Sequence, residues 1–301
     1  MIWGIIAGFS TALLNSAGYL FSARFLYYYK DPVRLLVMAS LVMMTVSLPF
    51  ALWLFPFSQI PELSTYILEA VASAMLFLVG QGAFFAALRF FEASRLSSLL
   101  GLKIIVLSCI FIISGGMLNF SQITAVIMAA AAALIFNWSG AGKSSWKGWL
   151  CLLMTLICYS SVDILETDLV VTVKENTTYS VMYSSLVVVM LLYSVVGMIM
   201  LPALFFFKPE RDQLIKAAPY GLLWLSSQVT ILCCYAFLQP VFGNVILATR
   251  GIFSVIAGAL LPYFGLAAFD SRIPLRLWVR RIIAAVVMLG AIALYSFGSI
   301  K

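Results

Sequence analysis

LSSLLGLKIIVL (residues 96–107) and VILATRGIF (residues 245–253) are largely apolar stretches that each hold one basic residue, Lys103 and Arg250. A charge near the middle of a bilayer costs about 2.5–3.5 kcal/mol on insertion scales, so it is rarely left there without a partner or a function. The two residues are 147 positions apart in a chain of 301. This spacing, close to half the chain, indicates an internal duplication.

The composition predicts an all-α membrane protein. Hydrophobic residues make up 64% of the chain and charged residues 10%, whereas soluble domains carry about 25% charged residues. Because backbone amides in hydrocarbon must be bonded within their own segment, apolar spans of about 20 residues form helices. Ten such stretches lie between the polar breaks, at 2–23, 33–55, 66–88, 96–116, 120–138, 147–166, 179–207, 217–238, 243–265 and 278–299.

The ten stretches divide into two halves, residues 1–140 and 145–301. Each half has five spans, an odd number, so the halves enter the membrane in opposite directions. This is a 5+5 inverted-topology repeat, which places a substrate site near the midplane between the halves. Gln81 and Gln228 are separated by the same 147 residues as Lys103 and Arg250, which supports the duplication.

The basic residues indicate an orientation. Fourteen of the 18 lie in the loops after the first, third, fifth, seventh and ninth stretches, whereas the opposite side holds only Lys174 and Lys301. The positive-inside rule places the basic loops in the cytoplasm and therefore the N-terminus outside.

Several short motifs add a family resemblance. They are Trp3-Gly4, Pro32-Val33-Arg34 at the second stretch, Phe85-Ala86-Ala87-Leu88 closing the third, Gln122-Ile123-Thr124-Ala125 opening the fifth, and Arg281-Ile282-Ile283-Ala284-Ala285 with Gly290 in the tenth. In this layout the chain resembles the drug/metabolite transporter superfamily, in its EamA-like branch of ten-helix transporters. The resemblance implies a 5+5 inverted repeat, export or exchange of small metabolites, and a cavity lined by spans 1, 3 and 4 and spans 6, 8 and 9. Many members have cytoplasmic termini, which is the alternative orientation.

Lys103 and Arg250 together predict a clamp for an anionic group. Arginine presents a planar fork that matches a carboxylate or phosphate, while lysine acts as a compact point charge. The phosphate-translocating and nucleotide-sugar branches of the superfamily resemble this chain in placing basic residues on the same two spans. A structural alternative is that each residue pairs with Asp163 or with a backbone carbonyl, or reaches toward the membrane surface. A third alternative is that the buried lysine is deprotonated.

Further polar residues fall in the same spans. Gln81 and Gln228 either donate hydrogen bonds to a substrate or bond neighbouring helices to one another. Asp163 either pairs with a basic residue or carries a proton, while Glu166 and Asp168 are expected nearer to water. Four more residues complete the predicted pocket, with helix capping as an alternative for the short polar ones: Tyr19, Ser97, Asn244 and Thr249.

The sequence also argues against other classes of function. The chain has no histidine, no metal-type grouping of its five cysteines and no Gly-x-x-x-x-Gly-Lys-Ser/Thr loop. We therefore expect no enzyme activity, cofactor, metal or nucleic-acid partner. The interpretation is a multi-pass secondary transporter in the plasma (inner) membrane, a monomer or homodimer in the lipid bilayer. It moves a small anionic or zwitterionic metabolite by alternating access. The alternatives are a structural or lipid-handling membrane protein and, less favoured, a membrane-embedded enzyme.

Overall fold

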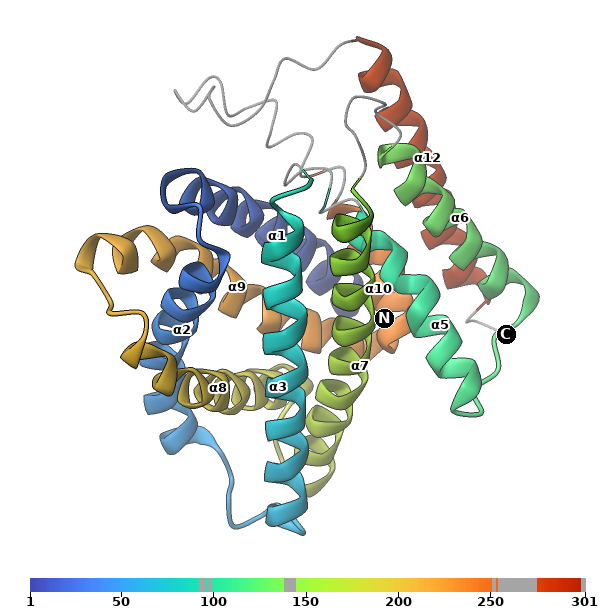
Figure 1. Cartoon of the computed structure of the whole chain (residues 1–301). Coiled ribbons are helices and arrows are strands. Elements are labelled where there is room, and N and C mark those ends of the chain that lie inside the picture. The colour runs from blue at the N-terminus through green and yellow to red at the C-terminus, as the bar shows by residue number, and fades with distance from the viewer. Residues whose placement is uncertain (92–95, 97–98, 138–144, 251–252, 254–274, 299–301) are drawn as a thin grey trace.

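The computed structural model describes residues 1–301 except 92–95, 97–98, 138–144, 251–252, 254–274 and 299–301, and in this part the chain is helical without strands (Figure 1). The prediction of an all-α chain is confirmed. The elements are α1 (Ile2–Tyr29), α2 (Pro32–Leu54), α3 (Leu63–Ala87), η1 (Leu100–Leu102), α5 (Lys103–Ile113), α6 (Phe120–Asn137), α7 (Trp146–Asn176), α8 (Val181–Met200), η2 (Leu201–Phe205), α9 (Arg211–Leu238), α10 (Pro240–Leu247) and α12 (Leu275–Gly298).

Six helices among the described residues are long and apolar enough to cross a membrane: α1, α2, α3, α7, α9, and α8 with η2. The fourth predicted stretch, 96–116, is shorter in the structure, because η1 and α5 together cover only residues 100–113. At 1.5 Å per residue this segment spans about 21 Å, less than the hydrocarbon layer. In the ninth stretch α10 covers 240–247, and most of the remainder of that stretch lies outside the described residues.

Local sequence signals explain where several helices begin and end. The Asp31 carboxylate accepts hydrogen bonds from the backbone amides of Val33 and Arg34 at the start of α2. At the start of α6, Asn119 and Gln122 bond one another's backbone amides, which is a capping box. Gly115, with φ of 90°, supplies the left-handed residue at which the chain leaves α5.

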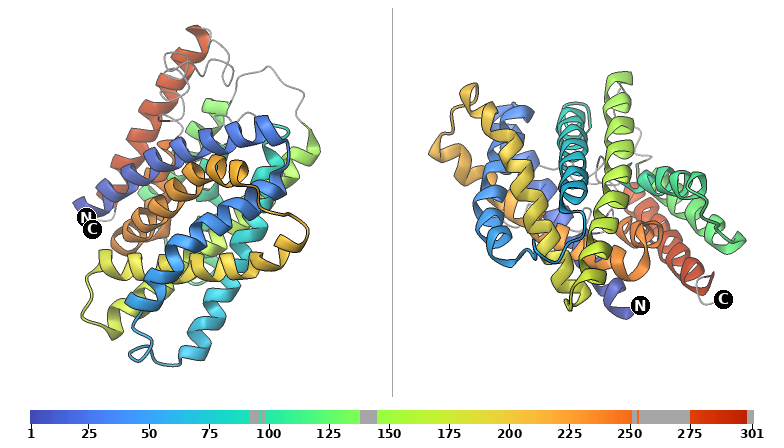
Figure 2. Two further views of the ribbon diagram at one scale, coloured as in Figure 1. Left: turned by 90° about the vertical axis from the view of Figure 1, so that its left-hand side faces the viewer. Right: turned by 90° about the horizontal axis from the view of Figure 1, so that it is seen from below.

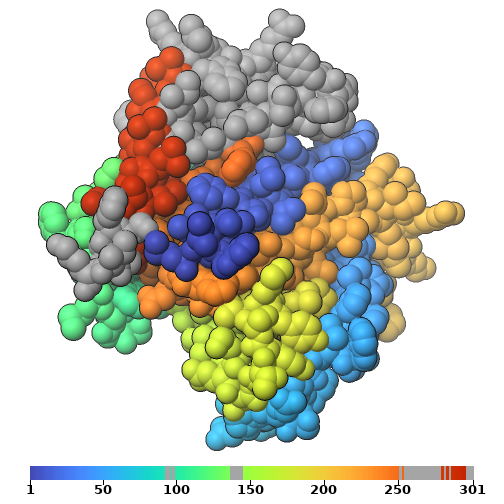
Figure 3. Space-filling view, turned by 180° about the vertical axis from the view of Figure 1, so that it is seen from behind, coloured from blue at the N-terminus to red at the C-terminus, as the bar shows by residue number. Residues whose placement is uncertain are grey.

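The helices pack in pairs that are distant in the sequence. α1 lies along α9, α3 along α7, α2 along α8 and α6 along α12 (Figures 1 and 2). Seen from behind, α1 crosses the surface beside α9 (Figure 3). One buried apolar cluster joins α1, α2, α3, α7, α8 and α9, and a second joins α5, α6, α10 and α12.

The contact between α2 and α8 is close. The Ser194 hydroxyl donates a hydrogen bond to the Ser47 hydroxyl at 3.2 Å. A Cβ atom at Gly197 would lie 2.2 Å from the Cβ atom of Met44, so the approach of the two helices depends on glycine at this position.

Candidate functional site

A buried ion pair joins α5 to α7. Lys103 is the first residue of α5, and its Nζ atom lies 2.6 Å from Oδ2 of Asp163, near the middle of α7. The two side chains are only 5% and 9% exposed. Lys103 Nζ also lies 5.8 Å from the centroid of the Tyr159 ring, one turn before Asp163. Of the alternatives that the sequence leaves open for Lys103, the structure shows pairing with Asp163.

Two neutral donors share the same carboxylate oxygen. The Tyr235 hydroxyl of α9 donates to Asp163 Oδ2 at 2.7 Å, and Nδ2 of Asn244 in α10 donates to it at 2.8 Å. Asn244 Nδ2 also lies 2.7 Å from the Tyr235 hydroxyl oxygen. Helices α5, α7, α9 and α10 therefore meet at one carboxylate. A buried charge is retained at lower free-energy cost when it is both paired and hydrogen-bonded, as Asp163 is.

Glu166 lies one turn further along α7 and is 3% exposed, so the expectation that it lies nearer to water is wrong. The predicted sixth stretch ends at residue 166, whereas α7 continues to Asn176. Glu166 accepts a hydrogen bond from the Ser73 hydroxyl of α3 at 3.3 Å, and it interacts electrostatically with Lys103. Asp168 lies on another face of α7.

Arg250 is also buried, at 4% exposure, and it lies against α1. Its carbonyl oxygen accepts a hydrogen bond from the Ser16 hydroxyl at 3.0 Å, and its side chain is hydrogen-bonded to Tyr19. Arg250 and Lys103 are close enough to interact electrostatically. The structure therefore brings four ionisable side chains into one buried group: Lys103, Asp163, Glu166 and Arg250.

Gln81 of α3 is fully enclosed and bonds two tyrosines. Its Nε2 atom donates to the Tyr220 hydroxyl oxygen at 2.5 Å, and its Oε1 atom accepts a hydrogen bond from the Tyr159 hydroxyl. Gln81 thus links α3 to α7 and α9, which is the helix-bonding alternative.

An aromatic cluster lies beside these tyrosines. Trp224 of α9 donates from Nε1 to the Tyr193 hydroxyl at 2.8 Å. Four further rings have centroids 5.8–6.2 Å from Trp224, a spacing that favours tilted aromatic pairs. They are Tyr19, Phe77, Tyr159 and Tyr220.

Of the remaining predicted residues, the two that the structure describes are not bonded to the buried ion pair or to Gln81. Gln228 is buried at 8% exposure but is not part of the Gln81 hydrogen-bond network. The Thr249 hydroxyl donates to the Ile246 carbonyl at 2.7 Å, which is a bond within its own turn. Ser97 lies outside the described residues.

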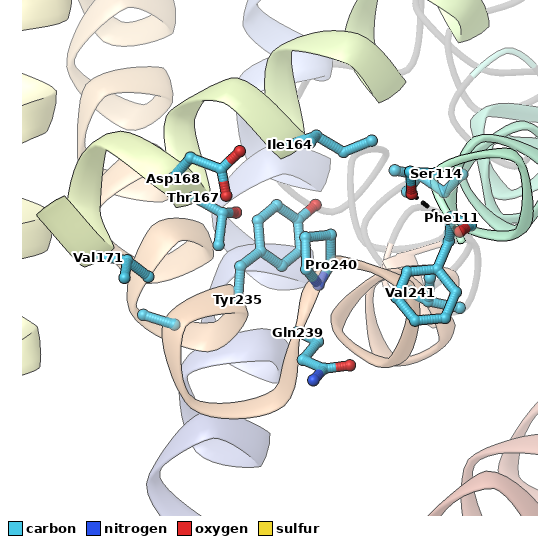
Figure 4. Close-up of a pocket in the computed structure, with 12 residues that line it drawn as sticks. Phe111, Ser114, Ile164, Thr167, Asp168, Val171, Tyr235, Gln239, Pro240 and Val241 are labelled. Carbon is cyan, nitrogen blue, oxygen red and sulfur yellow. Dashed lines mark hydrogen bonds between the residues drawn. The ribbon is translucent and has the colours of Figure 1, made fainter. Parts of the chain in front are cut away.

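A cavity of about 280 Å³ lies next to the charged group, between α5, α7 and the junction of α9 with α10. Figure 4 shows Tyr235 standing between Thr167 and Pro240 on its wall, with Asp168 and Gln239 nearby. Because the Tyr235 hydroxyl bonds Asp163, this side chain separates the cavity from the buried carboxylate. Neither Lys103 nor Arg250 lines the cavity.

Three members of the site were not among the residues predicted for it: Glu166, Tyr159 and Tyr235. A signal for two of them exists: Tyr159, Asp163 and Glu166 follow a spacing of four and three residues, which places them on one face of a helix. Tyr235 carries no such signal, since the residue 147 positions before it is Leu88.

Comparison with protein-family models and with curated proteins finds no match. Solved structures do match. One of them, described only as "Crystal structure of protein", aligns over 98% of this chain and 96% of its own, with a TM-score of 0.65 and 14% sequence identity. At this identity the likeness shows a shared fold and nothing of the activity.

Proposed function

We propose that this chain is a secondary transporter of a small anionic or zwitterionic metabolite, which it moves across the plasma membrane by alternating access. The observation that carries the proposal is the buried group of four ionisable side chains described above. Each charge is costly in hydrocarbon, at about 2.5–3.5 kcal/mol on insertion scales. A buried ion pair adds little to the stability of the fold, because apolar side chains of similar volume in the same place would stabilise it as well or better. Charged residues at such a depth are typical of a transport pathway.

The packing of the helices supports two five-helix repeats of opposite orientation, within residues 1–140 and 145–301. A two-fold axis that exchanges α1 with α7 and α3 with α9 turns the α1–α9 pair into the α7–α3 pair. The same axis maps the pairs α2–α8 and α6–α12 onto themselves. Ser47 and Ser194, which are 147 residues apart and bonded to one another, lie where such an axis would pass.

The same offset relates the two cations and their surroundings. Ser16 and Tyr19, which contact Arg250, are 147 residues before Asp163 and Glu166, which interact with Lys103. In this proposal the charged group lies between the two repeats, where an inverted-repeat transporter binds its substrate. The resemblance to EamA-like drug/metabolite transporters agrees with this arrangement.

The charges favour the class of substrate. A carboxylate or phosphate group would bind Lys103 and Arg250 once the Lys103–Asp163 pair opens, with a hydrogen bond from Tyr19. In a zwitterion, the cationic group would then approach Asp163. Gln228 and Asn244 complete the proposed pocket, and Gln81 holds its aromatic wall.

The test is a binding screen followed by a transport assay. Purified protein is screened by thermal shift against anionic, zwitterionic, neutral and cationic metabolites, because a ligand of the folded state raises the unfolding temperature. The stabilising compounds are then radiolabelled and measured for counterflow into proteoliposomes. We expect counterflow with an anionic or zwitterionic compound, and its loss in Arg250→Gln while the protein still folds. Stabilisation by cations only would refute the substrate class. Absence of counterflow with every stabilising compound would favour the structural or lipid-handling alternative.

A further inference from the structure

Glu166 is a buried acid that the proposed substrate site does not use. It is 3% exposed, and a carboxylate offers about four acceptor positions. Among the described residues, only Ser73 donates a hydrogen bond to it, at a long 3.3 Å. Asp163, by contrast, receives three short contacts on one oxygen, including the ammonium group of Lys103. The two carboxyl groups are therefore supported very unequally.

The charged and titratable groups around Glu166 also stabilise its carboxylate less than they stabilise that of Asp163. Asp163 lies one turn away on α7, and on α5 the ammonium group of Lys103 lies 2.6 Å from Asp163. On α8 the nearby titratable group is the Tyr193 hydroxyl, and on α3 the neighbour is Ser73, which does not titrate. One lysine thus faces two carboxyl groups. Because a second buried negative charge would be repelled by the first and poorly hydrogen-bonded, the neutral form of Glu166 is favoured.

Asp163 has further titratable neighbours that must be counted. They come from α1 and α9, and they are Tyr19, Cys234 and Tyr235. These groups are neutral when protonated. Arg250, in the segment after α10, interacts electrostatically with Tyr19, Tyr235 and Lys103 and adds a second positive charge to the buried group.

We propose that Glu166 holds a proton in this state and that the Asp163–Glu166 pair is the proton site of the transporter. The proposal rests on the proposed transport function and names its coupling ion. When an anionic substrate that carries no cationic group displaces Asp163 from Lys103, the Asp163 carboxylate loses its cation. Uptake of one proton by Asp163 then restores neutrality, so one negative charge of substrate and one proton enter the site together.

The cavity supplies the route for this proton. Tyr235 lines the cavity and its hydroxyl bonds Asp163 Oδ2, so a proton from water in the cavity needs to pass only this group. The hydroxyl gives its proton to Asp163 and takes one from a hydronium ion in the cavity, which becomes water, so Tyr235 is left unchanged. Glu166, one turn along α7 from Asp163, keeps its own proton throughout this step.

Infrared spectroscopy of the reconstituted protein tests the proton site without any substrate. The chain has only 11 acidic residues, so the background is small. We expect a carboxylic-acid C=O band at neutral pH that Glu166→Gln removes. The matched control is Glu175→Gln, the same substitution at an exposed position of the same helix, which should keep the band. Ser73→Ala should shift the band, because it removes the hydrogen-bond partner; this variant also serves if Glu166→Gln fails to fold.

Each outcome decides the proposal. Absence of the band from the wild type, or its persistence unshifted in both Glu166→Gln and Ser73→Ala, would overturn it. If wild-type counterflow is found but an inward pH gradient drives no accumulation of the same compound, the coupling is wrong and the transport proposal stands. If the band behaves as expected but no compound shows counterflow, the transport proposal and its coupling fail, and only the buried protonated Glu166 is retained.

Discussion

Replacing Asp163 by asparagine removes one charge from the buried pair and little else. Asparagine keeps the shape and still accepts hydrogen bonds from Tyr235 and Asn244, which now lie 2.7 and 2.8 Å from Oδ2. Lys103 loses the carboxylate at 2.6 Å. Breaking a buried ion pair by removing one partner costs about 3–5 kcal/mol. Because Glu166 still interacts with Lys103, we expect a loss near the lower limit, about 3 kcal/mol of unfolding free energy.

SDS-induced unfolding in mixed micelles measures this loss. The matched control is Asp212→Asn, which breaks the Asp212–Lys216 pair of similar length, 2.8 Å, at an exposed position. Water and salt screen that pair, so we expect no clear change there. Adding Lys103→Met to Asp163→Asn should restore part of the stability, because no unpaired charge then remains. A loss as small as that of the control, or strictly additive effects in the double mutant, would refute the ion-pair reasoning.

Three further predictions concern the packing and the orientation. Gln81→Leu should destabilise the fold by about 1–3 kcal/mol for each tyrosine hydroxyl left unpaired, and Gln228→Leu should cost less in the same SDS titration. Gly197→Ala should separate α2 from α8 and lower the unfolding midpoint, and a midpoint equal to that of the wild type would contradict the close contact. In intact cells, on a background without native cysteines, a membrane-impermeant thiol reagent should label Ser58→Cys but not Lys208→Cys; the reverse pattern would give the chain cytoplasmic termini.

The helical fold could be predicted from the sequence because apolar length is a direct signal. Predicted stretches of 20 or more largely apolar residues correspond to the long helices α1, α2, α3, α7, α8 and α9, with ends within about ten residues of those predicted. The prediction failed where hydropathy continues past the end of a helix. Residues 96–116 are largely apolar, but Gly115 ends the helix at Ile113, and η1 replaces regular α-helix before Lys103.

The site could be predicted only in part, because charges in apolar segments are visible and their partners are not. Lys103, Arg250 and Asp163 stand out in the sequence, and one of the expected alternatives was the pairing of Asp163 with a basic residue. Glu166 was placed near water because hydropathy falls at that point, although the spacing from Asp163 puts both on one helix face.

The repeat offset is a poor guide to the roles of the glutamines. Gln81 and Gln228 are 147 residues apart, and equal roles were expected for them. The hydrogen-bond partners of Gln81 are Tyr159 and Tyr220, whereas the residues 147 positions before these are Ala12 and Ser73. Neither offers a phenol to bond Gln228. Matching positions therefore indicate where side chains lie, but not what they contact.

The same divergence confines the proposed proton site to one half of the chain. Two identical halves would surround both cations with the same groups, and a proton could bind equally on either side. Here the pair of acids lies only on α7, beside Lys103, while the matching positions on α1 carry the hydroxyls of Ser16 and Tyr19 beside Arg250. Hydroxyls bind an anionic group without taking up a proton at neutral pH, whereas the carboxylates must be neutralised. Substrate binding is thus shared between the halves in this scheme, and proton binding belongs to α7 alone.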